Sequence, residues 1–307
     1  MGSILGAIMS KAVAIIGAGE IGRAIASILR RKKISVRLWD VDPAKVRGMK
    51  PIKETLAGTT AVFLCVPSWV LRAALRNVRP LLPRTAVVVV LSKGMEGKSK
   101  KTVAELLPDL LPPRQKWALL SGPMLAEELE QRRLGAGVIA TANREVFQTL
   151  ATLFRGTPLK VEWSKNPSAV AWAGVLKNVY AVGLGIADGL EWSWNAKGWF
   201  AAKALEEMHE IFDHLGFHAV HAAGVAGAAD FLATGFSPYS RNREFGERIV
   251  SRGECEFKSE GCISLPSVVA RLGAKTVRRF PVLHALSSVL IHHTDARKTF
   301  TKLFSGA

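Results

Sequence analysis

The feature that most constrains the fold is a glycine-rich turn between two short apolar segments near the N-terminus. Residues 12–16 predict a strand, 20–31 a helix and 35–39 a second strand, and the turn between the first two reads Gly17-Ala18-Gly19-Glu20-Ile21-Gly22. The first glycine permits a tight turn, the second lets a pyrophosphate approach the backbone, and the third allows close helix–strand packing. The helix N-terminus adds N–H groups for phosphates. This order predicts a dinucleotide site formed by Gly17, Gly19, Glu20, Ile21 and Gly22, with a plain tight turn as the alternative.

Asp40 follows the second strand, 18 residues after Gly22. A carboxylate there accepts hydrogen bonds from the adenosine ribose and favours NAD, whereas the nearby Lys45 and Arg47 suit the 2′-phosphate of NADP. The pattern therefore predicts NAD or NADP with a slight preference for NAD. The alternative is that Asp40 only supports the turn before Asp42-Pro43.

The first half of the chain alternates apolar runs with amphipathic ones. Near-continuous runs such as residues 87–91 suit strands buried on both faces, which indicates a parallel sheet covered by helices. Strands are expected at 12–16, 35–39, 61–66, 86–91, 117–120, 136–140 and 159–163, and helices at 20–31, 69–78, 101–111, 126–133 and 144–154.

After Ser164 the strand pattern stops, and the remaining segments are typical of helices. We therefore expect a tail at 1–10, an α/β domain at 11–164 and an all-α domain at 165–307, with Asn166-Pro167 starting its first helix. The further helices are predicted at 197–215, 218–234, 243–252, 266–272 and 281–292.

The charge is strongly basic and unevenly distributed. The net charge is +17, and residues 1–160 carry 26 Lys and Arg against 11 Asp and Glu. This favours an anionic partner: nucleic acid or a phosphorylated cofactor and substrate. The basic residues are scattered rather than clustered, so we expect small phosphorylated molecules. Three cysteines without paired spacing fit a reducing cytoplasm and predict no metal site.

The apolar stretch from Ala169 to Ala187 contains a single charged residue, Lys177, followed by Asn178. Burial disfavours the ammonium and lowers its pKa, which suits a proton donor. Alternatively, the lysine stem covers apolar surface while its head reaches water. The Lys-Asn pair and two glycines favour a buried helix over a membrane span.

Three loops at strand ends lie where open α/β sheets bind ligands. They are Val66-Pro67-Ser68, Ser92-Lys93-Gly94 and Ser121-Gly122-Pro123. Lys93 is a candidate for binding an anionic substrate, although a lone lysine is more often a surface residue. In the helical half, Ser240-Arg241-Asn242-Arg243 is either a phosphate clamp or a solvated helix start capped by Ser240. Asp230 is the only acid between His214 and Arg241 and, taken alone, is more often a cap or a paired structural residue.

Taken in order, these motifs resemble the NAD(P)-dependent sn-glycerol-3-phosphate dehydrogenase family. The resemblance rests on the glycine-rich turn, the three loops, Leu176-Lys177-Asn178-Val179, Asp230, the Ser-Arg-Asn-Arg run and Glu260-Gly261. It implies a Rossmann-type parallel sheet domain followed by an all-α domain, a 6-phosphogluconate-dehydrogenase-like architecture. It also implies interconversion of dihydroxyacetone phosphate and sn-glycerol 3-phosphate in the cytoplasm for glycerolipid synthesis. The oligomeric state stays open, a homodimer included.

The resemblance also implies roles for individual residues. Lys177, Lys93 and Asp230 would be catalytic. The substrate-binding set would be Lys93, Gly122, Asn178, Thr234, Ser240, Arg241 and Asn242. The cofactor-binding set would be Gly17, Gly19, Glu20, Ile21, Gly22, Asp40, Pro67, Lys93, Ala126, Arg241 and Glu260.

Two segments depart from the family pattern. Met124 stands where a small or hydroxyl residue is usual, and Ala229-Asp230-Phe231 stands where the family usually has Gly-Asp-Leu. They raise the question of a narrowed substrate pocket. The alternatives are a related two-domain reductase acting on another carbonyl compound, similar to ketopantoate reductase, and a nucleotide-sensing protein that binds nucleic acid.

Overall fold

A computed structural model describes residues 12–218 and 220–306, so the predicted tail at 1–10 lies outside the described residues. One compact unit holds the described residues up to Ser92 together with Val103–Val170, and the other holds Lys93–Thr102 and the residues from Ala171 onward. The segment 93–102 therefore leaves the first unit and packs within the second. The division into an α/β domain at 11–164 and an all-α domain at 165–307 stays a prediction.

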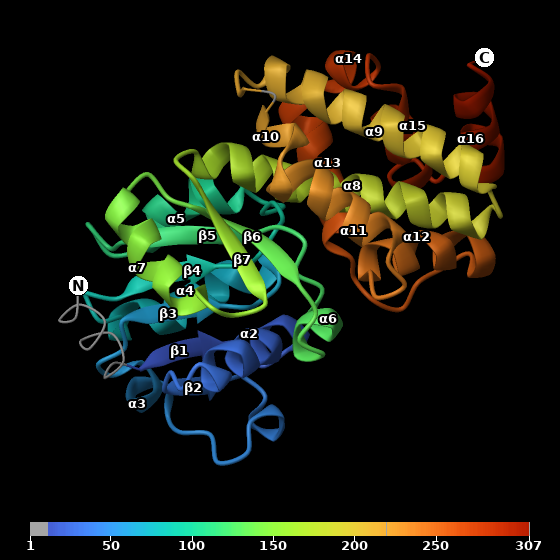
Figure 1. Cartoon of the computed structure of the whole chain (residues 1–307). Helices are drawn as coiled ribbons and strands as arrows, with labels where there is room; N and C mark the ends of the chain where they lie inside the picture. The colour runs from blue at the N-terminus through green and yellow to red at the C-terminus, as the bar shows by residue number, and fades with distance from the viewer. Residues whose placement is uncertain (1–11, 219, 307) are drawn as a thin grey trace. The chain divides into compact units, whose positions relative to one another are not determined.

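The first unit contains a seven-stranded sheet in the order β2-β1-β3-β4-β5-β6-β7 (Figure 1). Neighbouring strands from β2 to β5 pair in parallel, β6 pairs antiparallel to β5, and β7 is parallel to β6. The expected parallel sheet is confirmed for β1 to β5. Strands β6 and β7 run in the opposite direction, which the apolar runs do not distinguish from burial in a parallel sheet. The strands are β1 (Val13–Ile16), β2 (Val36–Trp39), β3 (Ala61–Leu64), β4 (Val87–Val90), β5 (Trp117–Ser121), β6 (Gly135–Ala140) and β7 (Leu159–Ser164).

Helices cover this sheet and bury its central strands. Every residue of β1, β3 and β4 is buried, as expected of strands with helices on both faces. Side chains of α2, α6 and α7 share one core cluster with alternate strand residues. The helices of this unit are α2 (Glu20–Arg31), α3 (Ile52–Leu56), α4 (Leu71–Val78), α5 (Val103–Leu110), α6 (Ala126–Glu130) and α7 (Arg144–Phe154).

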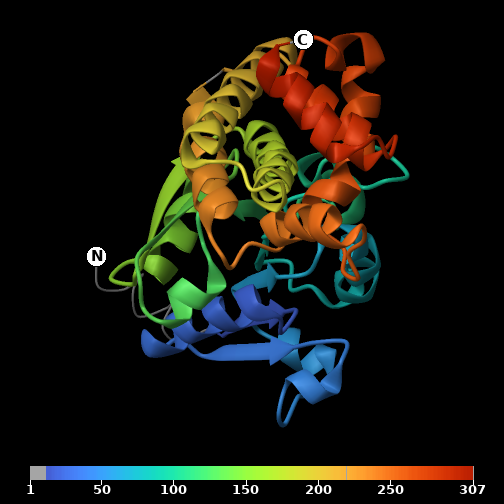
Figure 2. The same ribbon diagram turned by 90° about the vertical axis from the view of Figure 1, so that its right-hand side faces the viewer.

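The second unit is helical and built around α8 (Pro167–Gly189), which begins in the first unit and has other helices around it in Figure 2. It is the one described helix long and apolar enough to span a membrane, yet its apolar window is completely buried in the protein. A Cβ added to Gly185 would lie 1.9 Å from the Arg243 carbonyl oxygen, and one on Gly246 would lie 2.1 Å from that of Val182. The glycines therefore let α8 and α12 (Arg241–Arg252) touch backbone to backbone.

Two predicted helices differ from the observed ones. The segment 218–234 is divided into α10 (Val220–Ala223), a π-helical turn at Val225–Ala229 and α11 (Asp230–Phe236). Helix α13 (Glu260–Leu272) begins six residues before its predicted start at Pro266. Ser259 caps the helix, and Pro266 lies inside it. The other helices are α9 (Trp194–His214), α14 (Ala274–Val277), α15 (Pro281–Leu290) and α16 (Ala296–Ser305).

Candidate active site

The glycine-rich turn of the first unit has the backbone conformation that its sequence predicts. Gly17 has φ +103°, and a Cβ there would lie 2.4 Å from the Cys65 carbonyl oxygen. A Cβ on Gly22 would lie 2.0 Å from the Gly17 carbonyl oxygen, whereas one on Gly19 would meet no atom within 4 Å. Gly17 and Gly22 are thus required by the fold itself. Gly19 leaves open space beside the start of α2, where an approaching ligand would need it.

The N-terminus of α2 lies beside this open space. Glu20 and Ile21 begin the helix, and Gly19 at the N-cap supplies no side chain to bind the first amides. The free N–H groups and the helix dipole make this end suitable for phosphate.

Asp40 is buried and holds the turn together. Its Oδ2 accepts a hydrogen bond from the Ala18 backbone N–H at 2.7 Å, and its Oδ1 accepts one from the Asp42 N–H at 2.9 Å. The Lys45 ammonium lies 3.7 Å from Oδ1. The alternative interpretation, that Asp40 supports the turn, therefore describes bonds that are present, and ribose binding would have to use the remaining acceptor capacity of the carboxylate.

The other predicted site residues of the first unit lie at the carboxyl ends of strands. Pro67 follows β3 and is exposed, Gly122 follows β5 with φ +139°, and Ala126 is the first residue of α6. Met124 is buried in the core of this unit. Its side chain fills the core, so the predicted narrowing of a pocket by Met124 has no support here.

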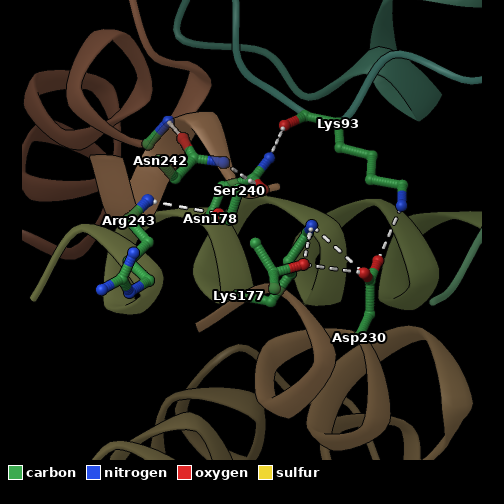
Figure 3. Close-up of polar contacts among 9 residues, drawn as sticks. Lys93, Lys177, Asn178, Asp230, Ser240, Asn242 and Arg243 are labelled. Atoms are coloured by element: carbon green, nitrogen blue, oxygen red, sulfur yellow. Dashed lines mark hydrogen bonds and ion pairs between the residues drawn. The ribbon is translucent and has the colours of Figure 1, made fainter. Parts of the chain in front are cut away.

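In the second unit, two lysines meet one carboxylate (Figure 3). The Lys93 Nζ lies 2.7 Å from Asp230 Oδ2, and the Lys177 Nζ lies 3.2 Å from Asp230 Oδ1. The Lys177 Nζ also donates to the Thr234 hydroxyl at 2.8 Å, and that hydroxyl donates to Asp230 Oδ1 at 3.2 Å. The structure thus brings together four residues that the sequence singled out, from the segment 93–102, α8 and α11.

Burial sets the electrostatics of this cluster. Lys177 is 5% exposed and Asp230 2% exposed, so the alternative of a lysine head reaching water is wrong. Burial lowers the pKa of Lys177 to about 8; Asp230 and Glu260 oppose this change, and Lys93 adds to it. Burial alone would raise the pKa of Asp230, but Lys177 and Lys93 outweigh it and hold that pKa below its ordinary value. At neutral pH the cluster therefore holds an ammonium that readily gives up a proton.

A chain of amide groups runs beside the lysine cluster. The Asn178 side chain donates to the Lys93 carbonyl oxygen at 2.7 Å. Asn242 donates to Asn178 Oδ1 at 2.9 Å and accepts from the Gly261 backbone N–H at 2.9 Å. Both asparagines therefore already have protein partners.

The Ser240–Arg243 run has three different contacts. Ser240 caps α12 by accepting from the Arg243 N–H at 3.2 Å, as the alternative for this segment expects. Arg243 forms ion pairs with Asp188 and Glu247. Arg241 is exposed, and its guanidinium lies 4.8 Å from the centre of the Phe257 ring. Of these residues, Arg241 is the cation best able to meet an anionic ligand.

Sequence reasoning missed two carboxylates of the helical unit that connect separate helices. Asp188 binds both Arg243 and Lys197, and it lies 11 residues, about three helical turns, after Lys177 on α8. This spacing puts Asp188 on the same side of α8 as Lys177, and it could have indicated Asp188 from the sequence. Glu207 accepts from the Tyr180 hydroxyl and from the N–H groups of Val282 and Leu283, a contact set between distant segments that no local pattern indicates. Phe231, whose ring packs edge-on against Tyr180, is likewise fully buried.

Family models match both halves of the chain. The NAD-dependent glycerol-3-phosphate dehydrogenase N-terminus and C-terminus family models match residues 43–147 and 166–301. A glycerol-3-phosphate dehydrogenase [NAD(P)+] of Azotobacter vinelandii is 30% identical over 302 residues, which cover 91% of this chain and 85% of that protein.

Solved structures show the same fold. The glycerol-3-phosphate dehydrogenase of Coxiella burnetii matches with a TM-score of 0.84 and 24% identity, covering 95% of this chain and 98% of that one. A PanE/ApbA family ketopantoate reductase of Ralstonia eutropha matches less well, with a TM-score of 0.58 and 17% identity over 95% of this chain and 99% of that one.

Proposed function

Because the chain belongs to the NAD-dependent glycerol-3-phosphate dehydrogenase family, we propose that it interconverts dihydroxyacetone phosphate and sn-glycerol 3-phosphate with NAD or NADP. The observation that carries this proposal is the buried cluster in which Lys177 and Lys93 share the Asp230 carboxylate. A buried ammonium with a pKa near 8 is suited to the proton transfer that ketone reduction requires.

Lys177 acts as the general acid of this reaction. The reduced nicotinamide cofactor, which the glycine-rich turn and Asp40 would hold, would supply the hydride that the ketone carbon accepts, so that the C=O double bond becomes a C–O single bond. Lys177 donates one proton to the oxygen as its negative charge develops, so that the alcohol forms and the lysine is left as a neutral amine. In the reverse direction the same amine accepts the hydroxyl proton.

Asp230 and Thr234 orient this proton donor. Asp230 supports the ammonium form and Thr234 fixes its direction, because both bind the Lys177 Nζ directly. Lys93 contributes a second positive charge that stabilises the developing alkoxide and attracts an anionic substrate. These roles assign the catalytic set Lys177, Lys93 and Asp230 to one cluster.

Arg241 is the proposed ligand of the substrate phosphate. Its planar guanidinium presents paired donors to phosphate oxygens. Among residues 12–218 and 220–306, the structure shows no carboxylate paired with Arg241, whereas Arg243 is neutralised by Asp188 and Glu247. Binding energy gained at the phosphate would orient the carbonyl carbon. Ser240 would serve by starting α12, and Gly122 and Asn178 stay proposed members of the substrate set.

The glycine-rich turn fits a dinucleotide. The space at Gly19 that a Cβ would fill and the uncapped N-terminus of α2 suit a pyrophosphate group. Asp40 favours NAD, and its partner Lys45 is placed to accept a 2′-phosphate instead. Pro67, Ala126, Glu260, Lys93 and Arg241 complete the proposed cofactor set. We place the enzyme in the cytoplasm, where its three free cysteines stay reduced, and a homodimer remains its proposed assembly.

The test is an absorbance assay of NADH and NADPH oxidation with dihydroxyacetone phosphate and with ketopantoate. We expect turnover with dihydroxyacetone phosphate, none with ketopantoate, and a modestly higher kcat/KM with NADH. Turnover with ketopantoate alone would assign the chain to the rival reductase. No turnover on either ketone, together with DNA binding at physiological salt, would favour the nucleotide-sensing alternative.

A further inference from the structure

Asn178 and Asn242 are arranged as a relay that ends on the backbone of Lys93. Three hydrogen bonds connect its members in one direction: the Gly261 N–H donates to Asn242, Asn242 donates to Asn178, and Asn178 donates to the Lys93 carbonyl oxygen. Each bond is 2.7–2.9 Å long, and both asparagines are at least nine-tenths buried.

The relay starts at a donor that its own helix leaves free. Gly261 is the second residue of α13, after the Ser259 cap and Glu260, so its N–H has no partner within the helix. The positive end of the helix dipole therefore points into the relay, and each amide polarises the next one toward the Lys93 carbonyl.

Glycine contacts fix the relay on both sides of α8. A Cβ on Gly261 would lie 2.2 Å from the Asn178 carbonyl oxygen, so α13 touches the backbone of α8 at this residue. Gly185 and Gly246 give the same close contact between α8 and α12, which carries Asn242. The backbones of α12 and α13 are therefore held against α8, which carries Asn178.

The segment held by the relay is also bound to α13 at other points, and the Arg271 side chain donates to the Lys100 carbonyl oxygen at 3.1 Å. Residues 93–102 connect β4 to α5 and belong to the helical unit. The Met95 N–H donates to the Ser264 hydroxyl of α13 at 3.1 Å, which fixes the segment two residues after Lys93. Asn178 fixes Lys93 itself, whose Nζ then reaches Asp230.

We infer that Asn178 and Asn242 are positioning residues, which act on the reaction by holding the Lys93 backbone so that its ammonium pairs with Asp230. This inference rests on the proposed function and adds a positioning role to two residues that the resemblance assigned to substrate binding.

The relay has a consequence that is measurable without substrate. Three charged groups from the surrounding elements act on Lys177, namely Asp230 of α11, Glu260 of α13 and Lys93 of the segment 93–102. Lys93 lowers the pKa of Lys177, so displacing Lys93 raises that pKa. A variant that breaks the relay should therefore have the same effect as one that removes Lys93.

The experiment is an NMR titration of Lys177 in protein labelled with ¹³C at lysine Cε, with the signal assigned by its loss in Lys177→Ala. We expect Lys93→Met to raise the pKa of Lys177, and Asn242→Ala and Asn178→Ala each to reproduce most of that rise. The double variant Lys93→Met/Asn242→Ala should show no further change, because both substitutions act through one group. Asn143→Ala, which removes the cap of α7 in the other unit, is the matched control and should leave the titration unchanged.

Kinetics supply the second measurement for variants that melt like the parent. Asn242→Ala should lower kcat/KM for dihydroxyacetone phosphate by about 10- to 100-fold, mainly in kcat, with no additional loss when combined with Lys93→Met. Arg241→Ala should raise KM and combine additively with Lys93→Met. A Lys177 titration unchanged in both asparagine variants would overturn the inference, whereas absent turnover in the parent would refute only the proposed function.

Discussion

The glycine-rich turn and the lysine cluster differ in where their parts come from. The turn is made by residues 17–22 and by Asp40, which binds Ala18 from only 22 positions away. The lysine cluster joins Lys93 to Asp230 across 137 positions and takes Lys177 from a third segment. One is a local structure that its own residues specify. The other exists only when the helical unit has folded around the segment 93–102.

The two regions also use burial differently. In the turn, the glycines have no side chains, so backbone atoms come close to one another and a ligand can reach them. In the cluster, burial lowers the pKa of Lys177, and the two lysines hold the pKa of Asp230 below its ordinary value. We therefore expect substitutions in the turn to act on folding or cofactor binding, and substitutions in the cluster to act on the chemical step.

The largest effect on the fold is expected for Gly22→Ala, which breaks the turn itself. Its Cβ would lie 2.0 Å from a backbone oxygen, which cannot move aside without unfolding the turn. The free energy of unfolding should fall by about 3 kcal/mol, and cofactor binding should be lost with it. Thermal denaturation and NADH fluorescence titration measure both. A variant with the parent's melting temperature would show that the turn has another geometry.

Lys93→Met should leave the fold intact and reduce the chemical step. The substitution keeps an apolar stem but removes the second cation of the cluster, so kcat/KM for ketone reduction should fall by about 100-fold. Initial-rate kinetics with dihydroxyacetone phosphate measure this loss. An unchanged kcat/KM would show that the ion pair with Asp230 is structural only.

The pH dependence should have opposite signs in the two directions. Lys177 must be protonated to reduce the ketone, so kcat/KM for reduction should be constant below its pKa of about 8 and then fall about tenfold per pH unit. Oxidation of the alcohol requires the neutral amine and should rise with pH up to the same value. Initial rates between pH 6 and 10 test this, and profiles of the same sign would exclude Lys177 as the titrating group.

Gly19→Ala should have the smallest effect and is the matched partner of Gly22→Ala. Its Cβ meets no protein atom within 4 Å, so the melting temperature should not change. The methyl group would occupy space needed by the pyrophosphate and should weaken NADH binding by about tenfold. Binding equal to that of the parent would place the cofactor elsewhere, whereas a loss of stability would contradict the open space at this position.

The difference between local structure and structure assembled from distant segments explains which features the sequence predicts well. The strand–turn–helix order around Gly17, the central strands and the long helix of Lys177 follow from local periodicity, and each lies close to its predicted limits. The π-helical turn before Asp230 does not. A Cβ on Gly227 would lie 2.1 Å from the carbonyl oxygen of Ala222, five residues earlier, and an apolar pattern with the helical period does not indicate this local contact. Nor does the reversed direction of β6, since its apolar run resembles that of a parallel strand.

In the candidate site, too, the sequence indicates the residues but not the contacts between distant segments. Sequence order and resemblance identified Lys93, Lys177, Asp230 and Thr234, and the spacing of four between the last two is typical of one helix face. What they do not indicate is that one carboxylate serves both lysines, or that the two asparagines bind the protein itself. Those contacts join α8, α11, α12 and α13 and are specified only by packing.

The central claim is that Lys177 gives the proton to the ketone oxygen. The measurement that tests it most directly is single-turnover reduction of dihydroxyacetone phosphate by Lys177→Ala with NADH already bound, because cofactor binding and product release then drop out of the rate. We predict a loss of at least about 1000-fold with NADH affinity unchanged. A single-turnover rate within about tenfold of the parent would contradict the claim.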